Sequence, residues 1–150
     1  MRVVIQRVKY ARVTVAEKIV GQIGTGLLIL VGFEESDGQE DFEWMANKII
    51  QLRIFPNDNG VMNISVQDAN GELMVVSQFT LHASTKKGNR PSYIKASNPK
   101  TAENQYERFV NVLQNKYIRN LQTGKFGADM KVELLNDGPV TICIDSKNKE

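Results

Sequence analysis

The segment Gly26–Phe33, which reads GLLILVGF, constrains the fold of this chain more than any other segment. A strand with one face in water alternates apolar and polar residues, whereas a strand that is apolar at successive positions is covered on both faces. The run is also much shorter than the ~18 residues that a membrane-spanning helix needs. We therefore predict a central β-strand here, buried between two layers, and no membrane association.

Further strands are predicted on both sides of this segment along the chain. The first sixteen residues are rich in valine and isoleucine, whose branched side chains favour the extended backbone of strands. No repeat, linker or low-complexity stretch interrupts the sequence, so we expect one α/β domain over residues 1–150. The other predicted strands are Ile19–Ile23, Glu72–Leu81, Met130–Leu135 and Val140–Asp145, the last two joined by a turn at Asn136–Pro139.

Two amphipathic helices are predicted between the strands. Asp37 followed by Glu40 resembles a capping box, and apolar residues then recur at helical spacing to a point near Arg53. The second helix is predicted to begin at Asn98-Pro99 and to end at Thr123-Gly124. Trp44 lies off the apolar stripe of the first helix. We expect it to pack against a flank of that helix or against a partner chain, with the partner favoured. The buried face of the second helix should comprise Ala102, Tyr106, Phe109, Val110, Leu113 and Tyr117.

The residue inventory excludes several chemistries. The 150 residues include one cysteine and one histidine, so neither a disulfide framework nor a metal site with two imidazoles is possible. The chain lacks the patterns G-x-S-x-G, G-x-G-x-x-G and the P-loop. Cys143 lies in the alternating segment VTICID, which favours a buried, inert thiol over a nucleophile. The first residues, MRVVIQRVKY, do not resemble a signal peptide. We expect a cytoplasmic protein without a metal or a cofactor.

A basic segment follows the predicted strand at Glu72–Leu81. No acidic residue lies between Glu72 and Glu103, although the net charge of the whole chain is only +2. Such a local excess of positive charge attracts phosphate groups, and an aromatic side chain beside it can stack on a nucleobase. The alternative interpretation is a solvated lysine loop. The presence of Tyr93 favours nucleic-acid binding over that alternative. The cations of this segment are Lys86, Lys87, Arg90, Lys95 and Lys100.

Two polar motifs are unusual for a generic β domain: SQFTL at 77–81 and NDGPVT at 136–141. Each alone has an ordinary explanation, a strand end and a hairpin turn respectively. Together, in this order, they resemble the two signature motifs of the D-aminoacyl-tRNA deacylases. The resemblance extends through MRVVIQRV, WMANKIIQLRIF, MNISVQD, RPSY and TGKFGADMKVELL, and so covers essentially the whole chain. Two departures are His82, where a tyrosine is common, and the basic segment KKGNRPSY, which has fewer arginines.

The resemblance implies a fold and a function. The family fold is a β-barrel-like α/β domain with two main helices. Its members are cytoplasmic homodimers that hydrolyse the ester between a D-amino acid and the 3′ end of tRNA, and they also act on glycine mischarged onto alanine tRNA. The resemblance places Gly138-Pro139, joined by a cis bond, in the active site of the partner subunit, and Met130 near the terminal adenosine. It assigns the pocket strand to Ser77, Gln78, Phe79 and Thr80.

The shortage of histidine and cysteine in this sequence favours a mechanism without a side-chain base. An aminoacyl ester is already activated, so orientation and an oxyanion site can suffice, and the backbone N–H groups of Phe79 and Thr80 are candidates for that site. The alternative is a nucleophilic Thr80, which would need a neighbouring base that the sequence does not reveal. Lys86, Lys87 and Arg90 are the candidate tRNA contacts. Two other functions remain open: a nucleic-acid-binding module without catalysis, and a structural dimer.

Overall fold

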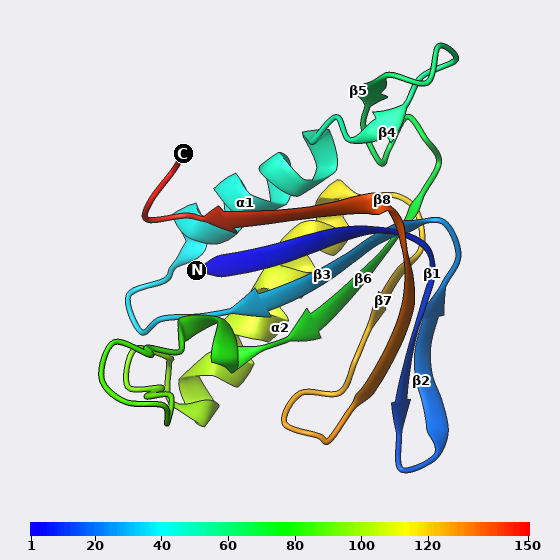
Figure 1. The fold of residues 1–150 in the computed structure, drawn as a ribbon. Coiled ribbons are helices and arrows are strands. Elements are labelled where there is room, and N and C mark those ends of the chain that lie inside the picture. Colours follow the sequence, from blue (N-terminus) through cyan, green and yellow to red (C-terminus); the bar gives the residue numbers. More distant parts are fainter.

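The computed structural model describes residues 1–150 as a curved six-stranded sheet with two helices on one face and a separate two-stranded hairpin (Figure 1). The sheet curls far enough to resemble an incomplete barrel, so the predicted fold class is confirmed. No helix is long and apolar enough to cross a membrane. The elements are β1 (Arg2–Val15), β2 (Lys18–Ile23), β3 (Gly26–Gly32), α1 (Gln39–Gln51), β4 (Phe55–Pro56), β5 (Met62–Ile64), β6 (Glu72–Ser77), the 3-10 helix η1 (Phe79–His82), α2 (Pro99–Lys116), β7 (Leu121–Thr123) and β8 (Lys131–Asp145).

Strand β1 organises the sheet because both of its edges are paired. One edge pairs with β8 from Arg2 to Thr14, and the other pairs first with β3 and then, beyond Val8, with β2. All of these pairings are antiparallel. Strands β3, β6 and β7 continue the sheet as parallel neighbours. The carboxyl ends of β3 and β6 therefore lie together at one edge of the sheet.

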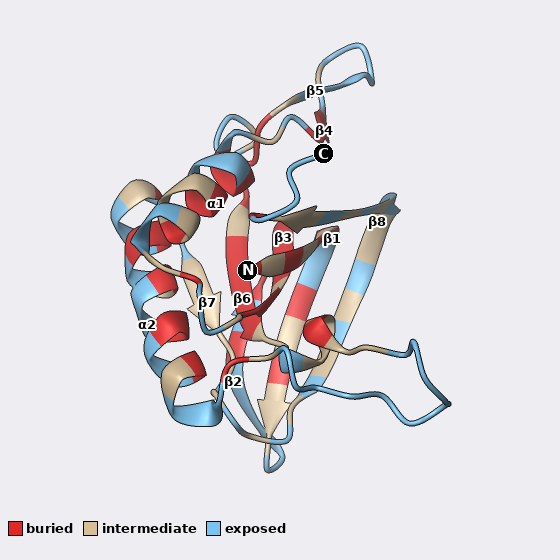
Figure 2. Cartoon of the chain, turned by 90° about the vertical axis from the view of Figure 1, so that its left-hand side faces the viewer, coloured by how far each residue is buried: buried red, intermediate tan, exposed pale blue.

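The prediction of a doubly covered central strand is confirmed. Leu27, Ile29 and Val31 of β3 belong to the main core, which lies between the sheet and the helices. Leu28 faces the other way, into a smaller core enclosed by the curled strands β1, β2 and β8. Figure 2 shows the buried positions gathered between the helices and the sheet and inside the curl. Strand β3 thus contributes to two cores, which explains why its sequence does not alternate.

Both helices form, with corrections at their ends. Helix α1 begins one residue later than the sequence pattern suggests, because the Gly38 amide donates to the Asp41 carboxylate at 3.0 Å. Helix α2 starts at the predicted Asn98-Pro99 cap but ends at Lys116. Residues 121–123 pair with β6 instead of extending the helix, since parallel pairing satisfies their backbone groups. Trp44 is partly buried and packs against the main core, with the ammonium group of Lys149 over its ring.

The face of α2 that packs on the sheet is largely the predicted one. Of the predicted residues, all are buried except Val110, which is partly buried against the main core. Gln105 and Val112 are buried as well. Gln105 is the unexpected member, because a buried amide needs hydrogen-bond partners that the helix itself does not supply.

Two predicted strand boundaries are wrong. The segment after Ser77 is not strand: Gln78 makes the last bond to β3, from its amide to the Val31 carbonyl at 2.7 Å, and η1 follows. The last two predicted strands are one strand, β8, since both halves pair with β1. The expected hairpin turn is instead a bulge. Between the pairs Gln6–Thr141 and Val8–Asn136, β1 advances by two residues and β8 by five.

The predicted burial of Cys143 is also wrong. Along this half of β8, Val140, Ile142 and Ile144 pack against the main core, so the residues between them lie on the opposite face of the sheet. The Cys143 thiol is free and exposed. The predicted alternation is present, but its phase depends on which face of β8 meets the helices.

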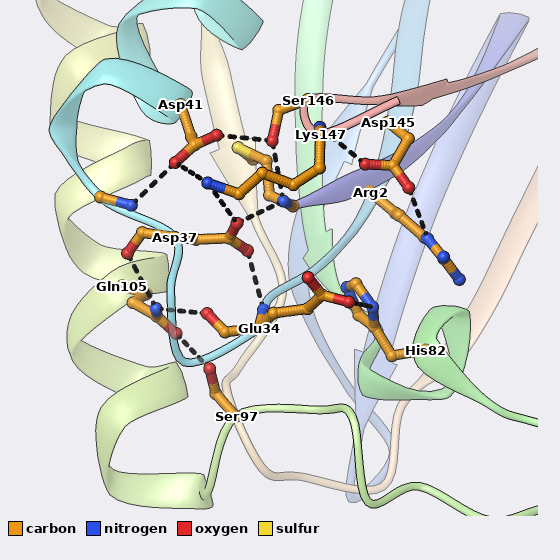
Figure 3. Close-up of polar contacts among 12 residues, drawn as sticks. Arg2, Glu34, Asp37, Asp41, His82, Ser97, Gln105, Asp145, Ser146 and Lys147 are labelled. Atoms are coloured by element: carbon orange, nitrogen blue, oxygen red, sulfur yellow. Dashed lines mark hydrogen bonds and ion pairs between the residues drawn. The ribbon is translucent and has the colours of Figure 1, made fainter. Parts of the chain in front are cut away.

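A buried polar network joins the start of α1 to both ends of the chain (Figure 3). The amino group of Met1 donates to Asp37 at 2.5 Å and to Ser146 at 2.9 Å, in a site that excludes water from Asp37 completely. Asp41 accepts hydrogen bonds from Ser146 and from the Lys147 ammonium. Burial alone would raise the pKa of the Asp41 carboxyl, but these bonds and the Gly38 amide outweigh it and lower the pKa from 3.8 to about 2.

We predict that Asp41 makes stability depend on acid. Its pKa is lower in the folded chain, so its contribution is complete above pH 3.8 and is lost as the pH falls through about 2. The unfolding free energy is measured by urea titration at about pH 5 and about pH 2. Its fall between these two values should be smaller in Asp41→Asn than in wild type by roughly 2 kcal/mol. Asp129→Asn, which alters an exposed carboxyl, is the control. An equal decline in wild type and Asp41→Asn would contradict the prediction.

Candidate active site

A cavity of about 750 Å³ lies at the carboxyl ends of β3 and β6. This edge of an α/β sheet is where ligands commonly bind, because strand ends and helix starts meet there. The floor is apolar, with Val31 from the end of β3, Phe33 directly after it and Val76 from β6. The remaining walls come from the start of η1, from segment 96–99 with the first turn of α2, and from loop 126–130 with Val132.

Three residues of the SQFT motif, which the resemblance assigns to a substrate pocket, form one wall of this cavity. Ser77, Gln78 and Phe79 line the cavity, whereas Thr80 does not. The hydroxyl of Thr80 accepts a hydrogen bond from the Gln78 amide group at 2.5 Å, within the same motif. Met130 lines the opposite side, where its sulfur packs close to Gly124.

The cavity contains few groups that could act as an acid or a base. Apart from Tyr93, its one titratable side chain is Asp129, which is exposed and pairs with Lys131 at 3.0 Å. No group of three or more histidine, cysteine, aspartate or glutamate side chains is placed to hold a metal ion. The polar lining consists instead of hydroxyls, amides and backbone groups. Such a lining can orient a ligand and donate hydrogen bonds to developing negative charge.

Segment 96–99 is held by a buried amide that sequence reasoning missed. Ser97 donates from its hydroxyl to Gln105 at 2.7 Å, and Gln105 donates to the backbone carbonyls of Glu34 and Asp37 (Figure 3). Ser97 also lines the cavity. The available signal was the position of Gln105, one turn beyond Ala102 on the apolar face of α2. A polar residue at a core position usually has a structural partner.

The basic segment projects from this edge of the sheet as an exposed loop. A bridge between Ser84 and Ser92 closes it, so Lys86, Lys87 and Arg90 lie outside the cavity. Tyr93, at its base, lines the cavity and meets the ring of Phe79 edge to face, with centroids 5.1 Å apart. Phe79 keeps 56% of its surface exposed. The two rings therefore form an aromatic rim between the cavity and the cationic loop.

The Gly138-Pro139 motif lies away from the cavity of its own chain. Both residues are exposed on the β8 bulge, and the peptide bond between them is cis, as the resemblance implies. Gly138 has a φ of +137°, and an added Cβ would lie 2.8 Å from the Val140 side chain. Glycine is needed here, because side chains are disfavoured at this φ and no space is left for one.

Arg7 supports this bulge from beneath and was not identified from the sequence. Its guanidinium donates to the Asp137 carbonyl at 3.0 Å and to the Ile54 carbonyl at 2.6 Å, and it also lies 3.5 Å from the Asp137 carboxylate. Alternation along β1 places Arg7 on the same face as the buried Ile5. A cation at a core position was thus the signal, because a buried charge needs a partner.

The fold and the cavity together define an α/β protein that would hold its ligand through backbone and neutral polar groups. A model of the family described as D-Tyr-tRNA(Tyr) deacylase matches residues 4–145. A D-aminoacyl-tRNA deacylase of Flavobacterium psychrophilum is 65% identical over 150 residues, covering 100% of both chains. The chain belongs to the D-Tyr-tRNA(Tyr) deacylase family.

Two solved structures are similar over nearly their whole length. One is a c-Myc DNA unwinding element binding protein, with a TM-score of 0.92 and 40% identity, covering 97% of this chain and 98% of that one. The other is a probable eukaryotic D-amino acid tRNA deacylase, with a TM-score of 0.81 over 95% of this chain and 97% of that one. At 16% identity, the second likeness concerns the fold alone.

We predict that Arg7 stabilises the bulge and therefore the whole sheet. Replacing it with methionine keeps an unbranched apolar stem but leaves the Asp137 and Ile54 carbonyls without their donor, which should cost about 1–3 kcal/mol in urea unfolding. Arg12→Met is the matched control, since Arg12 lies on the same strand in an exposed pair with Glu133. That variant should stay within about 0.5 kcal/mol of wild type. Equal losses in the two variants would show that Arg7 has no special role.

Proposed function

We propose that this chain hydrolyses D-aminoacyl-tRNA, releasing the D-amino acid and free tRNA. The observation that carries the proposal is the cavity wall formed by Ser77, Gln78 and Phe79 in a chain that belongs to a deacylase family. An apolar cavity of about 750 Å³ suits an aromatic amino acid together with part of the terminal adenosine. We assign Met130 to the adenosine side of the cavity, opposite the SQFT wall.

The chemical step is the attack of water on the ester carbonyl. The bond between the water oxygen and the carbonyl carbon forms, the bond to the 3′ oxygen of the ribose breaks, and that oxygen takes up a proton. The vicinal 2′-hydroxyl of the RNA positions the water. The first N–H groups of a helical turn have no partner within it, and Phe79 and Thr80 supply those groups in η1. They are the proposed donors to the oxyanion.

The lack of a base near Thr80 supports this mechanism over a nucleophilic threonine. A hydroxyl becomes a good nucleophile when a neighbouring base removes its proton. The partner of Thr80 is the amide of Gln78, which donates to the hydroxyl and cannot take its proton. The cavity supplies no histidine, lysine or glutamate. We therefore assign Thr80 a structural and backbone role.

The exposed Gly138-Pro139 bulge is proposed to complete the site of a second copy in a homodimer. A site that accepts many D side chains cannot select them by gripping each one, so it must block the direction that an L side chain would take. A backbone wall does this well, because proline fixes its own φ and glycine allows close approach. Support comes from the exposure of the motif and from the Arg7 contacts that hold it.

We assign the cationic loop to the phosphates of the tRNA acceptor end, with Lys86, Lys87 and Arg90 as contacts. Phosphate contacts of this kind orient the nucleic acid without reading its sequence. Their position beyond the Phe79–Tyr93 rim would lead the 3′ end into the cavity. The single free cysteine suits a reducing compartment, which supports a cytoplasmic location.

A second candidate function is nucleic-acid binding without hydrolysis. The similarity to a protein described as binding a c-Myc DNA unwinding element favours it, together with the cationic loop. Binding and hydrolysis predict different outcomes with the same substrate, because a binding module would retain D-tyrosyl-tRNA intact.

The first functional prediction concerns chirality. The wild-type protein should release D-tyrosine from D-tyrosyl-tRNA and glycine from glycyl-tRNA(Ala), but should spare L-tyrosyl-tRNA, since a site that works by rejection admits glycine. Gly138→Ala should lower the D-activity at least tenfold, about 1.4 kcal/mol in the barrier, without creating L-activity. Rapid-quench kinetics on the three esters decides the matter. Efficient L-cleavage, or complete protection of the glycyl ester, would show that the wall is not the selector.

The second functional prediction separates the two mechanisms. Thr80→Ala should keep a substantial fraction of wild-type kcat, because it retains the backbone N–H. A substrate ending in 2′-deoxyadenosine should react far more slowly, because it lacks the hydroxyl that positions water. Acid quenching followed by mass spectrometry tests for an acyl group on Thr80. A trapped acyl-threonine would replace this mechanism with the nucleophilic one.

A further inference from the structure

His82 is the last residue of η1, the turn that also contains Phe79 and Thr80. It is the buried residue of η1, with 1% of its surface exposed. The turn has little internal support, with bonds from the Leu81 amide to Gln78 at 3.3 Å and from the Ala83 amide to Thr80 at 3.0 Å. The position of the turn must therefore depend on the contacts that its buried residue, His82, makes with the rest of the protein.

The imidazole of His82 meets one charged group there. Its Nδ1 lies 3.3 Å from the Glu34 carboxylate, outside good hydrogen-bond angles, and Nε2 has no polar partner (Figure 3). A buried polar ring whose nitrogens lack hydrogen-bond partners is costly, so its presence here calls for a reason. Close packing reinforces the contact: a Cβ on Gly32 would lie 2.7 Å from the Gln78 carbonyl and 3.1 Å from the His82 ring.

Glu34 is itself firmly held, which allows it to act as an anchor. Its amide donates to Asp37 at 2.7 Å, and its carbonyl accepts from Gln105 at 2.8 Å. Asp37 is fixed by the Met1 amino group, and Gln105 also holds Ser97 in the cavity wall. The same buried network therefore contacts two walls of the cavity, the η1 turn and segment 96–98.

We propose that His82, through Glu34, is a positioning residue that sets where the Phe79 amide lies in the cavity wall and where the Thr80 amide lies beside it. The inference rests on the proposed deacylase site, because it assigns those amides a role at the reacting carbonyl. His82 does not line the cavity, so it acts through the η1 turn. Misplacing donors that act on the transition state lowers kcat and leaves substrate binding nearly unchanged.

The test measures D-tyrosyl-tRNA hydrolysis by His82→Phe, Glu34→Gln and the double variant. The concentration of functional sites is first measured by titration with a non-hydrolysable, amide-linked D-tyrosyl adenosine. Rates are divided by this concentration, so that a loss of folded protein is not mistaken for a lower kcat. Each single change should lower kcat roughly tenfold with KM within about twofold, and the double variant should be no slower than the slower single variant. Glu43→Gln, which breaks an ion pair between the two helices, should leave kcat unchanged.

A second measurement needs no activity. His82 is the one histidine of the chain, so its ring nitrogens can be observed by NMR without assignment. We expect Nδ1, the ring nitrogen nearer to Glu34, to carry a proton, and its signal to shift in Glu34→Gln but not in Glu43→Gln. The proposal is overturned by an unprotonated Nδ1, by additive losses in the double variant, or by unchanged kcat in both singles. An inactive wild type would instead overturn the proposed function.

Discussion

The double pairing of β1 is the constraint on which the rest of the structure depends. Its full length is bound to β8 on one edge, while its other edge changes partner from β3 to β2 between Val8 and Ala11. A strand that changes partner has to bend, and the strand bound along its other edge bends with it. The β8 bulge that carries Gly138 and Pro139 lies just before this point, between the pairings of Gln6 and Val8. The exposed motif and the bend of the sheet are therefore neighbours along β1.

The cavity follows from the other half of the sheet. Parallel pairing of β3 with β6 brings their carboxyl ends together, and the chain leaves β6 through η1 because Gly32 leaves room for the turn beside β3. The first turn of α2 approaches the same edge, with Ser97 held by Gln105. A site made in this way supplies oriented backbone and amide groups. It suits a reaction limited by orientation and charge stabilisation rather than by proton transfer to a side chain.

Much of the fold and part of the site could be predicted from the sequence, and the errors have physical reasons. The doubly buried β3 and the Asn98 cap depend on local pattern, and these predictions are confirmed. Ser77, Gln78 and Phe79 line the cavity, and their role in binding a substrate stays a prediction. The errors at Cys143 and at residues 121–123 are of another kind. In both places the outcome depended on which distant strand pairs with the segment, and local periodicity does not contain that information.

The sequence by itself determined the periodicity of each element, the lack of multi-histidine and disulfide chemistry, and the two motifs that mark the family. Only the tertiary structure decided that Asn136–Pro139 is a bulge in one strand, that Arg7 lies beneath it, and that His82 and Glu34 meet behind the cavity wall. The reason is that hydrophobic patterns and caps act over a few residues. The partners of Arg7 and His82 are 130 and 48 residues away along the chain, and a buried polar group finds such a partner only when the whole sheet is assembled.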